Sequence, residues 1–441
     1  MTAAIENVLA QATPLVVPGP VARKATVRVA EKVMSRVKEA AGAHGEVAGV
    51  FLGGSFAKDT WLPGDVDIDV FVKISPSVDE AKFEEVGLAV GRDALRGYKP
   101  GKKYAQHPYT EATVDGFKVN VVPCYDVKPG EWRSAADRSV HHVTFVRENL
   151  DEEARVQVRL LKRFMKAVGV YGAEIEMGGF SGYATEVLIH EYETFESTLG
   201  SFAVFVPDSK EEYFTLFDPI DDERDLGKAM ARETVARMVL ASRAFLETPS
   251  IAFFKGVRGR ARPKLQKMAY VIAFEHEELS EDTLWGELKR SARQVAKHLR
   301  EEGFELARVE AATDRRRSSA LIILPVVETL PRLEERLGPG VEILEGAKGF
   351  VAKNRDSAEL VWVGEDGRLR LLAERRFTSL ESLLEEVLRS RVGSIGVSKE
   401  VGEALKKNGR VLRGERLARE AGRKAWLKEG LAKTLSDSVG V

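Results

Sequence analysis

The sequence predicts a multidomain protein that combines α/β and α+β parts. Its 441 residues correspond to about three domains of ordinary size. Strand-like and helical segments alternate over the first ~130 residues, the middle third is mostly helical, and strands return after Pro249. We therefore expect three regions, at 1–150, 151–257 and 258–441.

The composition excludes several classes of protein. Lysine plus arginine number 67 against 68 for aspartate plus glutamate, so nucleic-acid binding would need local basic patches. Cys124 is the single cysteine, which excludes an intrachain disulfide and a cysteine-rich zinc site. No apolar run reaches the ~20 residues of a membrane helix, and the N-terminus lacks the basic start of a signal peptide. We expect a soluble, cytoplasmic protein without membrane contact.

The first region predicts a small sheet flanked by helices. Apolar residues recur at helical spacing in two segments, and strand-like runs are bounded by glycine turns. The expected elements are a helix over 22–42, a strand over 47–52 that ends in Gly53-Gly54-Ser55, a strand over 66–72, a helix over 79–95, a turn at Asp115-Gly116 and a strand over 117–123.

The other two regions predict helices first and then a second mixed unit. A helix over 151–168 carries one apolar face, and Ser181 can cap the next helix. An acidic loop over 217–225 precedes a helix over 226–246. The expected later elements are helices over 282–303, 329–336 and 379–391, strands over 304–312, 318–327 and within 358–375, and a basic helical tail over 399–436.

Two carboxylates on one strand give the strongest chemical signal. Asp67 and Asp69 alternate with Val66, Ile68 and Val70, so both acids face one side of the strand, ~7 Å apart. Carboxylates so placed can hold one or two Mg²⁺ ions, and Gly53-Gly54-Ser55 lets backbone amides approach a triphosphate closely. The alternative interpretation is a hairpin turn followed by a strand with a solvated acidic face.

The joint pattern resembles the nucleotidyltransferase signature of the polymerase-β superfamily. Longer stretches narrow the resemblance to the archaeal CCA-adding enzymes, the class I tRNA nucleotidyltransferases. They run in order from about residue 25 to past 375, and a chain-long series is hard to produce by accident. These stretches are Gly54-Ser55-Phe56-Ala57-Lys58-Asp59-Thr60-Trp61-Leu62, Tyr104 to Tyr109, Val121-Val122-Pro123-Cys124-Tyr125, Gly169 to Ile175, Gly179 to Tyr183, Asp218 to Asp221, and Arg375-Arg376-Phe377-Thr378.

The resemblance implies a fold and an activity. It implies a polymerase-β-type nucleotidyltransferase head at 1–150, a helical nucleotide-binding neck at 151–257, and an α+β body and tail at 258–441 that bind the tRNA acceptor arm. Members of the family add C, C and A to the 3′ end of tRNA from CTP and ATP, with Mg²⁺ and without a template. Some members are homodimers, and the residues do not show whether this chain is one.

The resemblance also assigns roles to single residues. Asp67 and Asp69 would bind the metal ions, and the nucleotide would be bound by Ser55, Lys58, His107, Lys162, Tyr171 and Arg224. Of these, Ser55, Lys58, Lys162 and Tyr171 would contact the triphosphate, and Arg224 would contribute to base selection. Lysine at position 58 replaces the more usual arginine and provides a point charge without a bidentate fork.

Asn120 departs from the family pattern at the third catalytic position. The family carries a carboxylate there, and asparagine offers a carbonyl oxygen without charge. Asp115 and Asp126 each lie roughly 16 Å or more away along an extended strand, so neither replaces it. We expect severely reduced nucleotide addition with binding largely kept. Asn120 is then an engineered block, a natural variant with weak activity, or the mark of a protein that has lost catalysis.

Two basic tracts are candidates for RNA binding. One contains Arg258, Arg260 and Arg262, and the other contains Arg416, Arg419 and Arg423 at helical spacing. The alternative interpretation of each tract is a solvated cationic face. Two other functions stay open beside CCA addition: a catalytically inactive tRNA-binding protein, and another polynucleotide adenylyltransferase of the same superfamily.

Overall fold

The computed structural model describes residues 3–104, 107–207, 213–256 and 263–436. These residues form two compact units, which divide between Gly256 and Pro263. Among the described residues, no helix combines the length and the apolar character that crossing a membrane requires.

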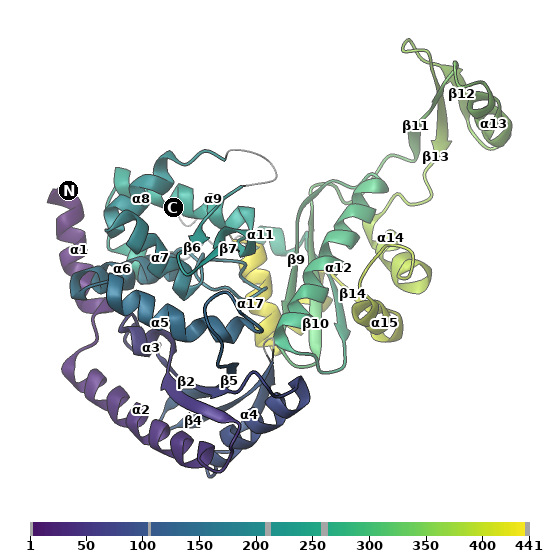
Figure 1. The fold of residues 1–441 in the computed structure, drawn as a ribbon. Coiled ribbons are helices and arrows are strands. Elements are labelled where there is room, and N and C mark those ends of the chain that lie inside the picture. The colour runs from purple at the N-terminus through teal and green to yellow at the C-terminus, as the bar shows by residue number, and fades with distance from the viewer. Residues whose placement is uncertain (1–2, 105–106, 208–212, 257–262, 437–441) are drawn as a thin grey trace. The chain divides into compact units, whose positions relative to one another are not determined.

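The first unit contains a five-stranded sheet in the order β1-β2-β5-β4-β3. Strand β2 (Asp67–Ile74) pairs in parallel with β5 (Phe117–Tyr125), and the other neighbours are antiparallel. The remaining strands are β1 (Val47–Leu52), β3 (Gly101–Tyr104) and β4 (Pro108–Val114). Helices α2 (Pro20–Ala41) and α4 (Glu80–Ala94) cover one face of this sheet (Figure 1).

Alternation along the strands explains why the other face is polar. Ile68, Val70 and Val72 on β2 are fully buried against the helices, together with Val119 and Val121 on β5. Side chains of a strand alternate between its two faces, so the residues between these apolar positions lie on the opposite side of the sheet. Asp67, Asp69 and Asn120 are such residues, which agrees with the prediction for β2.

Helices build the rest of the first unit around a second core. Ser181 caps α7 as predicted, because its hydroxyl accepts a hydrogen bond of 2.9 Å from the Ala184 amide. Seven buried phenylalanines pack in this core, and their rings contact one another edge-on or stacked. The helices are α1 (Ala3–Val16), α3 (Gly54–Lys58), α5 (Arg138–Asn149), α6 (Glu152–Ala167), α7 (Gly182–Tyr192), α8 (Phe195–Val204), α9 (Arg232–Glu247) and α10 (Ala252–Lys255), with 3₁₀ turns at Ala135–Asp137 and Leu226–Ala229.

The described residues of the second unit form two sheets. The larger has the order β14-β8-β10-β9 and buries the apolar run of β10 completely, while the smaller has the order β11-β13-β12. Its elements are α11 (Pro263–Gln266), β8 (Tyr270–Glu275), α12 (Glu281–Glu301), β9 (Leu306–Thr313), β10 (Ser318–Pro325), β11 (Leu333–Gly340), α13 (Leu344–Asn354), β12 (Leu360–Val363), β13 (Arg368–Glu374), α14 (Leu380–Glu386) with a π turn at Val387–Arg391, α15 (Lys399–Asn408), β14 (Arg410–Leu412), α16 (Gly414–Arg423) and α17 (Ala425–Thr434).

The helix predicted over 329–336 is wrong. Strand β11 begins at Leu333 and pairs antiparallel with β13. Its charged residues suit a helix in isolation, but Glu334 and Glu335 form ion pairs with Arg375 and Arg370, from β13 and the residue that follows it. Pairing with residues 28 to 41 positions away along the chain has overridden the local helical propensity here.

Two smaller corrections concern the ends of elements. The acidic segment over 217–225 forms a short hairpin of β6 (Phe217–Asp218) and β7 (Asp221–Asp225), and the next α-helix begins at Arg232 instead of residue 226. Strand β14 interrupts the helical tail because it completes the edge of the sheet beside β8.

Candidate active site

The start of β2 places two carboxylates beside a glycine turn. Asp67 and Asp69 lie on the sheet face that α2 and α4 leave open, and the Gly53 amide donates a hydrogen bond of 2.8 Å to the Asp69 carbonyl oxygen. Gly54 has a φ of +63°, a conformation that favours glycine. A Cβ atom there would lie 1.9 Å from Asp69 Oδ2, so only glycine lets this backbone approach the carboxylate.

Asn120 lies directly beside Asp69. The parallel register of β2 and β5 pairs these two residues, and Asn120 Nδ2 donates a hydrogen bond of 2.8 Å to Asp69 Oδ1. Asn120 is 8 % exposed, and its Oδ1 has no hydrogen-bond partner among the described residues. Burial raises the pKa of Asp69; the bond from Asn120 opposes that shift, and the nearby Asp67 carboxylate reinforces it.

A lysine and a third carboxylate complete this face of the sheet. Lys118 on β5 lies opposite Asp67, and its Nζ is 3.3 Å from Asp67 Oδ2 and 3.4 Å from Oε2 of Glu111 on β4. Although partial burial opposes the change, the Asp67 and Glu111 carboxylates raise the pKa of Lys118. We call Asp67, Asp69, Asn120, Glu111 and Lys118 the carboxylate face.

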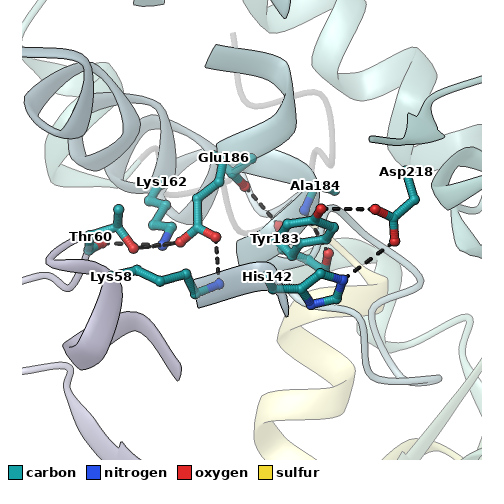
Figure 2. Close-up of polar contacts among 10 residues, drawn as sticks. Lys58, Thr60, His142, Lys162, Tyr183, Ala184, Glu186 and Asp218 are labelled. Atoms are coloured by element: carbon teal, nitrogen blue, oxygen red, sulfur yellow. Dashed lines mark hydrogen bonds and ion pairs between the residues drawn. The ribbon is translucent and has the colours of Figure 1, made fainter. Parts of the chain in front are cut away.

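Two buried lysines form ion pairs with one buried glutamate at the end of α3. Lys58, at the end of α3, is 2.5 Å from Glu186 Oε2, and Lys162 of α6 is 3.0 Å from Glu186 Oε1. The Thr60 hydroxyl donates to Glu186 and accepts a bond of 2.9 Å from Lys162 Nζ. Figure 2 shows these four side chains, which we call the lysine–Glu186 cluster, converging from three segments of the first unit.

The lysine–Glu186 cluster keeps its charges because they are paired. Burial alone would raise the pKa of Glu186, but Lys162 and Lys58 lower it to about 2. Burial lowers the pKa of Lys162, and the Glu186 carboxylate opposes that change. Two ammonium groups against one carboxylate leave the cluster with an excess of one positive charge, which favours an anion at its edge.

A second buried carboxylate organises the neighbouring hairpin. Asp218 accepts hydrogen bonds from the Tyr183 hydroxyl at 2.8 Å and from Arg224 Nη1 at 3.1 Å, and His142 Nε2 lies 3.4 Å from it. The His142 ring stacks on the Tyr183 ring, with the two ring centroids 3.5 Å apart, and both side chains are drawn in Figure 2. Burial would raise the pKa of Asp218, yet bonds from His142, the Ile220 amide and Tyr183 lower it. We call the side chains of Asp218, Tyr183, Arg224 and His142 the Asp218 network.

Lys58 connects the lysine–Glu186 cluster with the Asp218 network. Its Nζ lies 5.4 Å from the centroid of the Tyr183 ring while it is paired with Glu186. The first unit therefore brings three features together: paired carboxylates beside an open glycine turn, a cluster with excess positive charge, and an aromatic and arginine pair held by Asp218. This combination suits a nucleoside triphosphate and its metal ions.

Comparison with known proteins decides the family. Three family models match the chain: a nucleotidyltransferase domain over 31–142, the second domain of tRNA nucleotidyltransferase over 156–255, and the C-terminal domain of the CCA-adding enzyme over 266–414. The CCA-adding enzyme of Methanopyrus kandleri is 35% identical over 97% of this chain and 96% of its own length. That of Pyrobaculum islandicum is 33% identical over 92% and 98%.

The chain belongs to the CCA-adding enzymes. The resemblance seen in the sequence is confirmed, and so is the predicted class of fold, a nucleotidyltransferase head followed by helical and mixed parts. The predicted boundaries at 150 and 257 stay a prediction. The solved structure of a cytoplasmic RNA terminal U-transferase, with a TM-score of 0.44 and 11% identity over 56% of this chain and 94% of its own, is too distant to add to this conclusion.

The structure gathers most predicted nucleotide contacts of this CCA-adding enzyme in one place. Ser55 and Lys58 lie in α3, directly after the glycine turn. A Cβ atom added at Gly182 would lie 3.0 Å from the Tyr171 hydroxyl and 3.8 Å from Lys162 Nζ, so the ends of both side chains lie beside Gly182. Arg224 belongs to the Asp218 network, next to Lys58. Their roles toward a nucleotide stay predictions.

The structure does not bring His107 to this site. His107 precedes β4 and packs on Phe83 and Tyr125, with its Nδ1 3.6 Å from Glu84 Oε1. Tyr125 is five positions beyond Asn120 on β5, about 16 Å along the strand, so His107 lies at the far end of the sheet. In this geometry His107 serves the packing of α4 against the sheet.

The predicted RNA-binding arginines divide into two groups. Arg258, Arg260 and Arg262 lie outside the described residues. Arg416, Arg419 and Arg423 lie on α16 of the second unit, where all three are exposed and Leu417 and Ala421 are buried on the opposite side. The helical spacing is therefore confirmed, and contact with RNA stays a prediction.

Sequence reasoning gave no role to seven residues of the site. Four of them are buried, namely Thr60, Tyr183, Glu186 and Asp218; Glu111 on β4 and His142 on α5 are partly buried, and Lys118 on β5 is about half exposed. One signal was available for Glu186: it is a charged residue inside the apolar helix Gly182–Tyr192, and such a charge needs partners.

Proposed function

We propose that this CCA-adding enzyme adds C, C and A to the 3′ end of tRNA from CTP and ATP, by nucleotidyl transfer that depends on Mg²⁺. Membership of the family supports the reaction. The observation that carries the proposal is the juxtaposition of Asp67 and Asp69 with the Gly53-Gly54 turn, at the edge of the lysine–Glu186 cluster. A cytoplasmic location, where tRNA and nucleotides occur together, belongs to the same proposal.

The residues of the carboxylate face fit a hard divalent cation. Asp67 and Asp69 offer carboxylate oxygens, and Asn120 Oδ1 is a buried amide oxygen without a hydrogen-bond partner in the described structure. Mg²⁺ prefers such oxygen ligands. When bound, the ions would neutralise charge on the triphosphate and lower the pKa of the attacking hydroxyl.

The other residues bind and orient the nucleotide in this proposal. Lys58, Lys162 and Tyr171 contact the triphosphate, because the lysine–Glu186 cluster has excess positive charge and Tyr171 is in reach of Lys162. The Tyr171 hydroxyl stays a donor, since burial raises its pKa. Asp218 positions Arg224, whose planar donors suit the edge of a base.

A 3′-end extension assay tests the proposal. The substrates are a tRNA transcript that ends at the discriminator base, CTP, ATP and Mg²⁺, with Asp69→Asn as the inactive control. We expect ordered addition of C, C and A by this chain and none by Asp69→Asn. Strong preference for ATP on RNA unlike tRNA would instead indicate another polynucleotide adenylyltransferase. Binding of tRNA without any addition, even after Asn120→Asp, would indicate an inactive binding protein.

The exposed arginines of α16 are expected to bind the phosphates of tRNA. Changing Arg416, Arg419 and Arg423 together to alanine removes three cations from one helix face, so tRNA affinity should fall by about 10-fold or more. The dependence of log Kd on log salt should flatten by about 2 to 3, as expected for the loss of up to three phosphate contacts. Filter binding over a series of salt concentrations measures both the tRNA affinity and its dependence on salt.

A matched control for this prediction lies on α12 of the same unit. Arg293, Lys297 and Arg300 are exposed at similar helical spacing, and their triple alanine variant should change the affinity less than twofold. An equal loss in both variants would show that affinity follows net charge and that α16 has no special role.

A further inference from the structure

Glu111 is a carboxylate of the site that the sequence motif does not contain. It lies on β4, and the antiparallel register of β4 and β5 pairs it directly with Asn120. Directly paired residues of neighbouring strands point to the same face of the sheet. Asp69, Asn120 and Glu111 therefore form one row across three adjacent strands.

The residue at the centre of the row, Asn120, has a hydrogen-bond acceptor that no described residue satisfies. Asn120 donates through Nδ2 to Asp69, and its Oδ1 is buried without a hydrogen-bond partner among the described residues. A buried amide oxygen without a partner costs free energy unless something binds to it. A hydrated divalent cation is the ligand class that suits an amide oxygen flanked by carboxylates.

Lys118 links Glu111 of this row to Asp67, the other carboxylate of β2. Lys118 Nζ is 3.3 Å from Asp67 Oδ2 and 3.4 Å from Glu111 Oε2, so both carboxylates reach one cationic group. The Glu111 side chain is 24% exposed, and its Oε1 also lies 4.0 Å from Lys103 Nζ on β3. Asp115 and Asp126 do not compete, because they pair with Lys32 and Lys73 away from this row.

We propose that Glu111 supplies the third negative charge of the divalent-cation site, which Asn120 cannot supply. Asp67, Asp69 and Glu111 then hold the cation as three carboxylates from β2 and β4, with the Asn120 Oδ1 between them. This inference rests on the proposed function for the nucleotide that the cation accompanies, and its test is direct cation binding.

Mn²⁺ binding to the full chain tests the inference without any reaction. Free Mn²⁺ is measured by electron paramagnetic resonance during titration of the protein, with no nucleotide or tRNA present. Glu111→Gln should weaken Mn²⁺ binding by about 10- to 100-fold, which is the usual cost of losing a group that supports a metal site. Asp115→Asn removes the same charge from the same hairpin and should change the binding less than twofold; asparagine also tolerates the positive φ at this position.

Two further variants separate direct support of the cation from control of Lys118. In a Lys118→Met background, Glu111→Gln should still weaken Mn²⁺ binding at least 10-fold; no loss would show that Glu111 only restrains Lys118, and would overturn the inference. In an Asn120→Asp background the effect of Glu111→Gln should shrink to less than about threefold, because a third carboxylate is then present. If Glu111→Gln weakened Mn²⁺ binding as strongly in the Asn120→Asp background as in the unchanged chain, the inference would also be overturned.

The two proposals fail in different ways. Loss of Mn²⁺ binding in Glu111→Gln, together with no addition of nucleotides by the unchanged chain, would support the cation site and reject CCA addition. Addition of nucleotides with Mn²⁺ binding that is indifferent to Glu111 would reject the inference and leave the proposed function in place.

Discussion

Changing Asn120 to aspartate is expected to raise the rate of nucleotide addition by about 10²-fold, since a preorganised electrostatic contact typically contributes 10²–10³. The parallel register places this residue directly beside Asp69, so the new carboxylate would join the same row. Glu111 lies one strand further away and supplies charge without replacing a carboxylate on β5. Single-turnover extension with saturating tRNA and CTP measures the rate.

The affinities for the nucleotide and for tRNA should change little in the Asn120→Asp variant. The predicted triphosphate contacts are Ser55, Lys58, Lys162 and Tyr171, and the predicted tRNA contacts within the described residues lie on α16, so neither set includes residue 120. Asn7→Asp, an exposed change on α1, is the control and should leave the rate within twofold. Equal rates for the unchanged chain and for Asn120→Asp would contradict the prediction and show that three carboxylates on β2 and β5 are not required.

The sequence predicted the parts of the site that lie in one continuous pattern. Alternation of acids with Val66, Ile68 and Val70 identified the face of β2, and the structure confirms it for Ile68 and Val70, which are fully buried in the core with the helices. The Ser181 cap is equally local, since it depends on residues three positions apart. In both cases the physical cause acts over a few residues.

Most of the missed residues depend on contacts between distant segments. Lys58 and Glu186 are 128 positions apart, and a lone lysine at the end of a short helix does not reveal which acid it will meet. Glu111 was missed for a different reason: it lies only nine positions before Asn120, and although the turn at Asp115-Gly116 was predicted, the strand β4 that this turn folds back onto β5 was not. Strand register decides such contacts, and the sequence does not display it.

The same argument explains the wrong helix over 329–336. Its leucines and charges fit helical spacing in isolation, and pairing with β13 decides the outcome. His107 is a different case. The family resemblance implied that it lies near the nucleotide, whereas the fold places it beside Phe83 and Glu84.

Removing the charge of Glu186 is expected to have the largest effect on stability. Glu186→Gln keeps the shape but leaves Lys58 and Lys162 buried beside each other without a counter-ion, and breaking a buried ion pair typically costs about 3–5 kcal/mol. Hydrogen exchange of α6 and α7 peptides in increasing urea measures the free energy of opening for this unit alone. Glu191→Gln, an exposed change at the end of α7, should cost under about 0.5 kcal/mol.

The pH dependence gives the same prediction a second readout. The folded-state pKa of Glu186 is lowered to about 2 from an ordinary value of 4.5, so its carboxylate stabilises the fold fully above pH 4.5. This contribution should be lost as the pH falls from 4.5 toward 2, because the unfolded chain takes up the proton first. The difference in opening free energy between this chain and Glu186→Gln should therefore narrow over that range. A difference that stays constant, or a cost under about 1 kcal/mol near neutral pH, would show that the two lysines do not depend on Glu186 for their charge balance.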